Sequence, residues 1–443
     1  MDHLPTMILH NVLAKADAKD CARAACVDRR WRQSVDEDSL WKEFCFRDFL
    51  LTSAIDESGS KSSSYKEAYI SWHNKFARYP IPLVSRARQC WDRIKSWLCS
   101  NFAEVLTTLA PGVSWAEIEK AERQLRFTLP DSVRLLYQMC NGQVLPEIRG
   151  QAEDMHPDNN FFLGLLGGYH VYEHFVNVRL LSLKEMVKLT NLVLPRLYPA
   201  GDVKRIMIAR SCNFGKFFFV DCNDGLVYVG TGRLEEDAEM MPCVPLQEPN
   251  SSPKDGMLRW LENFSHCLQN GMYGVRQHDY GFRSISLFPL KEPSCTQAIT
   301  YGLQVKCAAV FLPELSRIEV PGESNDESYM FAYSVRMRLL EEGNRYCGKV
   351  MESAQLVGRH WIIRFNKEIT GEVRGEAVIG LYPLLRAGGE EFVYESRSAQ
   401  KGRRGGSMEG DFIFVPGRIS KPEGAQFAAY IARFPLDLPD YIY

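Results

Sequence analysis

The chain has 443 residues, of which 45% are hydrophobic and 24% are charged, as is typical of a water-soluble globular protein. At about 150 residues per domain, this length predicts roughly three domains and argues against a single compact fold. The chain has 53 Lys and Arg against 55 Asp and Glu, and its net charge of -2 excludes the overall basic character of a dedicated nucleic-acid-binding protein.

The 13 cysteines are scattered without a C-x-x-C pair, which argues against a zinc ribbon or a thioredoxin-like redox motif. We expect reduced, mostly buried thiols. Residues 1–20 lack the apolar core of a signal peptide, and no stretch approaches the roughly 18 apolar residues of a membrane span. These features predict a cytoplasmic or nuclear protein without a membrane partner.

The first region, residues 1–79, is predicted to be helical because its apolar residues recur at helical spacing. Asp20 is the predicted N-cap of the second of three helices. Helices this short need neighbours to bury their apolar stripes, and the polar segment 56–64 is expected to be a loop. The apolar faces are expected at Leu9, Val12 and Leu13, at Ala24, Val27 and Trp31, and at Leu40, Trp41, Phe44 and Cys45.

The second region, residues 80–272, mixes helical and strand patterns. Ser114 and Glu117 form an S-x-x-E capping box, which predicts that a helix begins there. A second helix is expected to begin at Pro130 and to end at Asn141–Gly142 with a left-handed C-cap.

Further along this region, a third helix is expected from Pro253 to Asn270–Gly271. The turn at Asn223–Gly225 contains Asp-Gly, which suits positive φ and predicts a hairpin between the strands that flank it. The strands expected are Arg205–Ala209, Phe217–Val220 and Leu226–Val229.

The third region, residues 280–443, changes to a period of two. Apolar residues alternate with polar or small ones over at least six short segments, separated by Gly and Pro turns. This pattern predicts an antiparallel β-sandwich. The segments with this alternation are Leu303–Cys307, Phe331–Leu339, Trp361–Phe365, Phe392–Tyr394, Phe412–Phe414 and Phe427–Ile431.

The first 45 residues or so resemble an F-box, through Leu-Pro, a helix, Cys-Val, Arg-Trp and Leu-Trp in this order. The resemblance implies docking onto the Skp adaptor of a Skp–cullin–F-box (SCF) ubiquitin ligase. A unit this small cannot bury all of its apolar side chains internally, which leaves a face for a partner. The alternative is that this block is only a helical cap on the next domain. The residues that the resemblance assigns to adaptor binding are Leu4, Pro5, Leu9, Val12, Leu13, Trp31, Leu40 and Trp41.

The second region is similar to the SUKH superfamily, whose members mostly act as protein-binding modules. The similar stretch runs from Trp115 to Asn141–Gly142 and continues over Gly164 to Tyr169 and a helix around Glu185. The resemblance implies a binding role and names no ligand.

Residues 301–443 resemble the bacterial ApaG domain. The pattern includes Arg359-His360-Trp361, Gly371-Glu372-Val373 and further glycines and aromatic residues at fixed offsets as far as Phe412. It implies a fibronectin-like β-sandwich, in agreement with the period of two. The order of F-box, SUKH-like and ApaG regions resembles the plant Skp-interacting-partner F-box proteins and their animal counterparts. The expected fold class is therefore multidomain α+β, with a helical F-box, a mixed α/β SUKH-like domain and a C-terminal antiparallel β-sandwich.

Bacterial ApaG domains carry a G-x-G-x-x-G sequence, and the corresponding segment here has Ala377 in place of the middle glycine. A phosphate loop of this kind needs a strand before it and a helix N-terminus after it, whereas the surroundings have strand patterns throughout. A nearby basic, glycine-containing segment is a second candidate for anion binding, and a solvated hairpin tip is its alternative. The candidate anion-binding positions are Gly375, Gly380, Lys401, Arg403 and Arg404.

Residues 170–174 spell H-x-x-E-H, formally an inverted zinc-protease motif. That chemistry needs both histidines on one face of a helix, whereas Gly167-Gly168 upstream and the β-prone neighbours argue against a helix. We therefore expect His170 and His174 to be surface histidines and predict no metal or cofactor. No nucleophile elbow or Walker loop appears, and no catalytic residue is predicted.

These patterns predict a non-catalytic substrate-recognition subunit of an SCF ubiquitin ligase. Its expected partners are the Skp adaptor, the cullin–RING scaffold and an unidentified target protein, and no nucleic acid. The target would contact the SUKH-like and ApaG-like domains. The alternative is a phosphate- or nucleotide-handling protein that acts through the ApaG-like domain.

Overall fold

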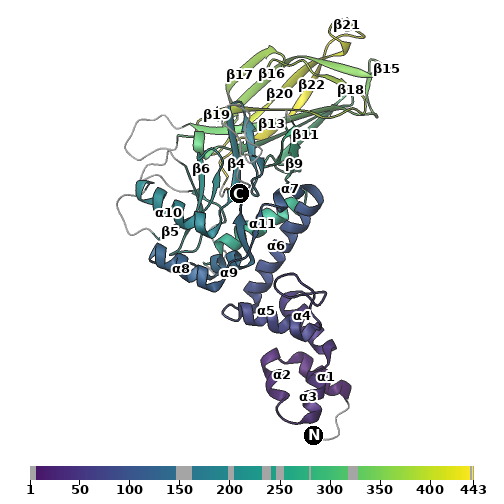
Figure 1. Ribbon diagram of the computed structural model, residues 1–443. Coiled ribbons are helices and arrows are strands. Elements are labelled where there is room, and N and C mark those ends of the chain that lie inside the picture. The colour runs from purple at the N-terminus through teal and green to yellow at the C-terminus, as the bar shows by residue number, and fades with distance from the viewer. Residues whose placement is uncertain are drawn as a thin grey trace.

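The computed structural model describes residues 6–145, 162–197, 204–231, 241–245, 254–278, 281–317, 328–439 and 442. A unit of short helices, a mixed middle region and a β-sandwich follow one another along an elongated molecule (Figure 1). All 13 cysteines are free, and most are buried or partly buried. Within the described ranges, no helix is both long and apolar enough to cross a bilayer.

The helical N-terminal unit differs from the prediction at one break. Asp17 caps one helix by accepting the backbone N–H of Asp20 at 2.6 Å, and Asp28 caps the next by accepting that of Trp31 at 2.9 Å. The predicted single helix that begins at Asp20 is therefore wrong, because the Asp28 carboxylate stabilises a second helix start. The helices are α1 (Thr6–Lys15), α2 (Ala18–Ala24), α3 (Arg29–Val35), α4 (Asp38–Phe49) and α5 (Tyr65–Phe76), and the segment between α4 and α5 is the expected loop.

A long helix, α6 (Ile81–Asn101), connects the N-terminal unit to the middle region (Figure 1). Its 21 residues span about 30 Å, and its apolar face is buried. Near its start, Arg88 Nη1 donates a hydrogen bond to the carbonyl oxygen of Phe49 at 2.5 Å. Arg86 Nη2 donates to Glu262 Oε2 at 2.7 Å in the middle region. Helix α6 is therefore tied to the parts of the molecule on both of its sides.

The middle region contains a sheet with the strand order β8-β7-β6-β5-β4-β3-β10-β9, with helices packed against it. Its last two strands lie beyond residue 272, where the sequence placed a domain boundary. The helices are α7 (Ala103–Leu106), α8 (Trp115–Leu125), α9 (Asp131–Met139), α10 (Leu183–Leu197) and α11 (Gly256–Gln269). The strands are β1 (Leu109–Pro111), β2 (Cys140–Gln143), β3 (Gly168–Val171), β4 (His174–Leu180), β5 (Arg205–Ser211), β6 (Lys216–Asp221), β7 (Val227–Thr231), β8 (Met241–Pro242), β9 (Gly274–Gln277) and β10 (Arg283–Ser286).

Most local predictions for the middle region are confirmed. Ser114 and Glu117 form the reciprocal capping box at the start of α8. Strands β6 and β7 pair as the predicted hairpin, and α11 ends at Gln269 with Asn270 as its C-cap. Pro253 lies outside the described residues.

The predicted C-cap at Asn141–Gly142 is wrong, because both residues lie in β2. Gly142 does adopt a positive φ of 65°. A Cβ atom there would lie 2.3 Å from the carbonyl oxygen of Leu181, so the close approach of that backbone requires glycine.

The predicted β-sandwich is confirmed. One sheet has the order β11-β12-β13-β19, and the other has β17-β16-β20 with β22 also paired to β20. The core between them is aromatic, with Trp361 packed against Tyr333, Phe412 and Phe434. The elements are β11 (Cys295–Thr300), β12 (Leu303–Phe311), the 3-10 turn η3 (Pro313–Leu315), β13 (Tyr329–Leu339), β14 (Arg345–Tyr346), β15 (Lys349–Val350), β16 (Ser353–Phe365), β17 (Glu368–Glu376), β18 (Leu384–Arg386), β19 (Phe392–Gln400), β20 (Gly406–Arg418), β21 (Lys421–Pro422) and β22 (Phe427–Pro435).

Candidate functional site

Helix α1 presents apolar side chains on two different faces. Leu9 and Leu13 are buried against the other helices, with 3% and 2% of their surface exposed. Met7, Ile8 and Val12 are exposed, and Val12 keeps 51% of its surface free. Ile8 and Val12 are four residues apart, so they share one face of the helix. Met7, one position before Ile8, points about 100° further around the helix. We call Met7, Ile8 and Val12 together the apolar face of α1.

Several residues predicted to contact the adaptor lie instead in the core. Leu40 and Trp41 on α4 are buried, and Trp41 Nε1 donates a hydrogen bond to the carbonyl oxygen of Val35 at 2.6 Å. The structure corrects the prediction here: Leu9, Leu13, Leu40 and Trp41 support the helical unit from inside, because a small unit needs its largest apolar side chains for its own core.

Among the remaining predicted adaptor contacts, Val12 is exposed and Trp31 is half-buried. Leu4 and Pro5 lie outside the described residues. Sequence reasoning missed Met7 and Ile8, because helical spacing shows that a face is apolar without showing which face turns inward.

A polar brace holds α1 in place against α4 and α5. Arg47 Nη1 donates to the carbonyl oxygens of Ala14 at 3.2 Å and Ala16 at 2.9 Å, just where α1 ends. Arg47 also pairs with Asp48 at 2.7 Å, and the Tyr69 hydroxyl donates to Asp48 at 2.8 Å. The hydrogen bond to Asp48 raises the pKa of Arg47, and burial raises the pKa of Tyr69 well above its ordinary value. The orientation of α1 is therefore fixed.

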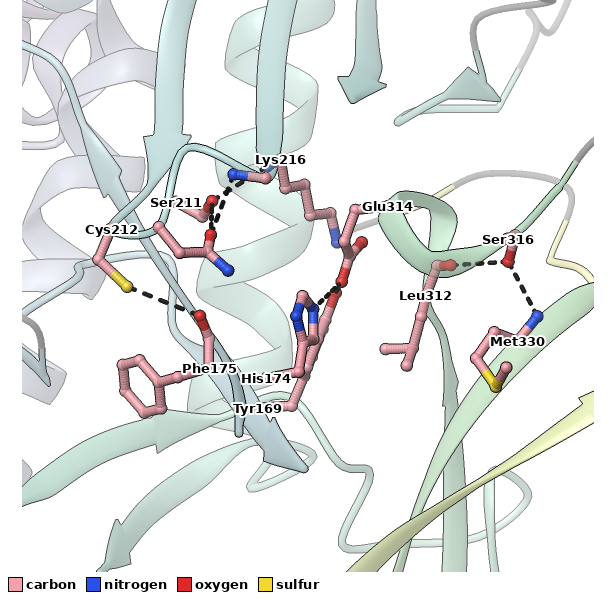
Figure 2. A network of polar contacts seen from close by, with 12 residues as sticks. Tyr169, His174, Phe175, Ser211, Cys212, Lys216, Leu312, Glu314, Ser316 and Met330 are labelled. Atoms are coloured by element: carbon pink, nitrogen blue, oxygen red, sulfur yellow. Dashed lines mark hydrogen bonds and ion pairs between the residues drawn. The ribbon is translucent and has the colours of Figure 1, made fainter. Parts of the chain in front are cut away.

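A second polar cluster joins the middle region to the β-sandwich. Figure 2 shows Tyr169 on β3, His174 on β4 and Lys216 on β6 directed toward Glu314, which lies in η3 of the sandwich. The Tyr169 hydroxyl donates to Glu314 Oε1 at 2.5 Å, and His174 Nε2 lies 2.9 Å from the same oxygen. Sequence reasoning missed this cluster. Lys216, a lysine at the edge of an apolar strand, was the one visible signal.

The electrostatics of this cluster favour a charged Glu314. Burial alone would raise the pKa of Glu314, but the hydrogen bond with His174, the charge of Lys216 and the hydrogen bond from Tyr169 together lower it. Burial lowers the pKa of Lys216, and Glu314 partly offsets this effect. Burial and the adjacent carboxylate raise the pKa of Tyr169. The negative charge of Glu314 is thus stabilised by groups that come from the middle region.

Two further contacts connect the same two regions. The Tyr172 hydroxyl, in the turn between β3 and β4, lies 2.7 Å from Ser396 Oγ on β19. Arg276 on β9 forms an ion pair with Glu395, also on β19. The middle region and the sandwich are therefore joined along β19 as well as through Glu314.

The two candidate anion-binding segments of the sandwich lie far apart. The N–H of Asn366, in the turn before β17, donates to the carbonyl oxygen of Gly405 at 2.9 Å, which places the basic segment with Lys401, Arg403 and Arg404 at that end of β17. Gly375 and Gly380 belong to the opposite end. At about 3.3 Å per residue, these ends lie about 25 Å apart.

The glycine segment also lacks the geometry of a phosphate loop. Gly375 lies within β17, and the next element after Gly380 is the strand β18, so no helix N-terminus follows. The glycine segment therefore does not form a phosphate loop, because such a loop needs the amides of a helix N-terminus after it. Anion binding by the basic segment with Lys401, Arg403 and Arg404 stays a prediction.

The H-x-x-E-H segment forms a hairpin, in agreement with the argument against a helix. His170 lies on β3, and His174 begins β4. His174 is half-buried rather than a surface residue, because it hydrogen-bonds Glu314. The helix on which the metalloprotease pattern depends is not formed.

Two family models match the chain. An F-box-like model matches residues 1–47, and a model of the ApaG domain matches residues 320–416. Protein ApaG from Nitrosomonas europaea is 34% identical over 139 residues, which cover 31% of this chain and 92% of that protein.

Other relatives align with nearly the whole of this chain. F-box protein SKIP16 from Arabidopsis thaliana is 41% identical over 446 residues, which cover 99% of this chain and 98% of the relative. F-box only protein 3 from Homo sapiens is 24% identical over 428 residues, which cover 94% of this chain and 79% of the relative. The helical N-terminal unit, the C-terminal ApaG sandwich and this full-length similarity together show that the chain belongs to the family of F-box proteins represented by SKIP16.

Proposed function

We propose that this protein is a substrate-recognition subunit of an SCF ubiquitin ligase. In this proposal the apolar face of α1 (Met7, Ile8 and Val12) binds the Skp adaptor, with Trp31 as a further contact. The middle region, which we propose to be SUKH-like, and the ApaG sandwich together bind the target protein. Ubiquitin transfer would be carried out by the ligase complex, and this chain would position the target.

The observation that carries the proposal is the exposure of Met7, Ile8 and Val12 in a unit that already has a complete core. Exposed apolar side chains on neighbouring positions of one helix are typical of a protein-binding surface. Arg47 and Asp48 fix the orientation of this helix, which reduces the entropy that would be lost on binding. The apolar face of α1 and Arg47 lie within residues 1–47, the segment that matches the F-box-like model.

The middle region and the sandwich support the part of the proposal that concerns target binding. The buried cluster around Glu314 and the contacts along β19 join the middle region to the sandwich, so both can present one continuous surface to a target. Helix α6 separates this surface from the adaptor-binding unit (Figure 1). Such a separation suits a subunit that holds the adaptor at one end and a target at the other.

A pull-down with purified Skp adaptor tests the adaptor-binding part. We expect the full chain to retain the adaptor and the double variant Ile8→Asp with Val12→Asp to lose at least about a hundredfold in affinity, because charges would be placed in an apolar interface. Both side chains are exposed, so the variant should fold normally. Leu9 is not a suitable target, because a charge there would disrupt the core.

Ile70→Asp is the matched control. Ile70 lies on α5, outside the F-box-like match, and its exposed fraction of 43% is close to the 45% of Ile8. We expect this variant to bind the adaptor like the wild type. Equal retention of the wild type and the double variant would contradict the proposal, and so would retention of neither.

A further inference from the structure

The long edge strands of the sandwich differ in what covers them. At one side, β11 lies beside β22: Thr296 Oγ1 donates to the carbonyl oxygen of Ala432 at 3.3 Å, and the N–H of Tyr430 donates to Thr300 Oγ1 at 3.1 Å. At the other side, β19 is covered by Tyr172 of the middle region. Within the described ranges, strand β17 pairs only with β16 and leaves its second edge open.

The open edge of β17 carries free backbone hydrogen-bonding groups. Residues 372 and 374 are exposed, and the pairing register places them opposite residues 362 and 360 of β16. The carbonyl oxygen of Glu376 already accepts a hydrogen bond from Arg359 Nη1 at 2.6 Å. The N–H of Ala377 donates to the carbonyl oxygen of Val357 at 3.1 Å, so by alternation Gly375, Val373 and Gly371 are the residues that bond to β16. The backbone groups of Glu372 and Arg374 therefore point outward, ready to pair with another strand.

The sequence of this edge is complementary to itself. In an antiparallel pairing of two copies centred on Val373, the Val373 side chains of the two copies face each other, and each Gly371 faces Gly375 of the other copy. Within one chain, Arg374 Nη2 donates to Glu372 Oε1 at 2.8 Å, and His360 Nε2 lies 2.9 Å from the same oxygen. Each Glu372 also faces Arg374 of the other copy, so in the dimer the two pairs join into one network of alternating charges on one face. Glu372 and Arg374 are hydrogen-bonding partners in this register. Their backbone groups are also the ones that point outward, as an antiparallel ladder requires.

We propose that two copies of this chain pair through β17, antiparallel and centred on Val373, to form a continuous sheet across a twofold axis. An isologous contact of this kind closes on itself and stops at the dimer. The exposed Ile369 and Val373 lose contact with water, and opposite charges on facing positions stabilise the register. The dimer goes beyond adaptor binding, and it would give one ligase assembly two target-binding ends.

Analytical ultracentrifugation of the full chain without adaptor tests the dimer. A pair of short strands buries less than the roughly 1,200 Å² of a standard interface, so dimers are expected in the micromolar range rather than below it. Glu372→Arg alone and Arg374→Glu alone each place like charges opposite one another twice, and should weaken the dimer about tenfold. The double variant Glu372→Arg with Arg374→Glu exchanges both partners and should restore it.

Disulfide trapping tests the register. In a background where the exposed Cys26, Cys99 and Cys347 are replaced by Ser, Val373→Cys should form a reducible dimer, because facing residues at a non-hydrogen-bonded position are close enough for a disulfide. Ile369→Cys is the control, since its side chain is also exposed on the same strand, at 55% against 44% for Val373, but lies away from the axis.

A chain that stays monomeric at high micromolar concentration would overturn the proposal. Failure of the double charge exchange to restore the dimer, or equal trapping at positions 369 and 373, would overturn it as well. A monomer that binds an extended target peptide along β17 would also be a contradiction, because it would assign the edge to a different partner. None of these readouts uses the Skp adaptor, so they fail or succeed independently of the proposed ligase role.

Discussion

The two ends of this molecule are stabilised in different ways. The helical N-terminal unit has an apolar and aromatic core, with Trp41, Phe44 and Tyr69 in mutual ring contact, and its polar brace lies at the edge of that core. The junction between the middle region and the sandwich instead contains the buried charges of Lys216 and Glu314. The helical unit is therefore stabilised mainly by its apolar core, whereas the middle region and the sandwich depend on each other for charge compensation.

Removal of the Glu314 carboxylate is the largest change that would break this dependence. Glu314→Ala leaves Lys216 buried without its counter-charge, and should lower the free energy of unfolding by about 3 to 5 kcal/mol. Chemical denaturation of the full chain measures this loss, and we also expect the shared transition of the middle region and the sandwich to separate into two steps. Glu368→Ala, at an exposed position on β17, is the control and should change stability by no more than about 0.5 kcal/mol. A loss as small as that of the control would show that the junction does not depend on this carboxylate.

The two faces of α1 provide the second contrast. Leu9→Ala opens a cavity in the helical core and should cost about 2 to 4 kcal/mol of stability, whereas Val12→Ala removes an exposed side chain and should cost less than about 0.5 kcal/mol. Thermal unfolding of both variants measures the difference. Val12→Ala should weaken adaptor binding despite its normal stability. The assignment of the two faces would be wrong if Val12→Ala were the more destabilising change.

Acid should weaken the junction between the middle region and the sandwich. The pKa of Glu314 is lower in the folded protein than its ordinary value, so the stability that it contributes is fully present above the pKa of an unfolded glutamate, about 4.3. That contribution is lost as the pH falls through the lower, folded pKa. Denaturation curves recorded at a series of acidic pH values should show this loss in the wild type and a flatter dependence in Glu314→Gln. The same slope in both proteins would contradict the assignment.

The smallest expected effect concerns the break between α2 and α3. Asp28→Ala removes the side-chain acceptor for the first N–H groups of α3 and should cost about 1 kcal/mol. Thermal unfolding measures it, with Asp28→Asn as a control that keeps an acceptor oxygen. No difference between the alanine and asparagine variants would indicate that the cap does not define the helix start.

The local elements were predictable where one rule dominates. The alternation along Trp361–Phe365 and Phe412–Phe414 sufficed for the sandwich strands, and the capping box at Ser114 marked the start of α8. The break at Asp28 was missed because the apolar residues keep their helical spacing across it. That spacing predicts one continuous helix, whereas the Asp28 cap favours a new helix start. Gly142 was assigned to a C-cap because its positive φ was recognised while the neighbouring backbone of Leu181 was not.

The candidate sites were less predictable than the elements. Helical periodicity identified α1 as amphipathic, but the choice between Leu9 and Ile8 as the inward residue depends on how α3 and α4 pack against it. The cluster around Glu314 joins residues 145 positions apart, Tyr169 and Glu314, and no local pattern signals such a contact. The distance between the two candidate anion-binding segments likewise follows only from the length of β17.

Hydrogen–deuterium exchange of the full chain, with and without purified Skp adaptor, tests the central claim most directly. We expect binding to slow exchange of the amides of α1 and of the segment around Trp31, and to leave β17 and the strands around Glu314 unchanged. Protection confined to the middle region or the sandwich, with α1 exchanging as in the free chain, would contradict the assignment of the adaptor-binding face.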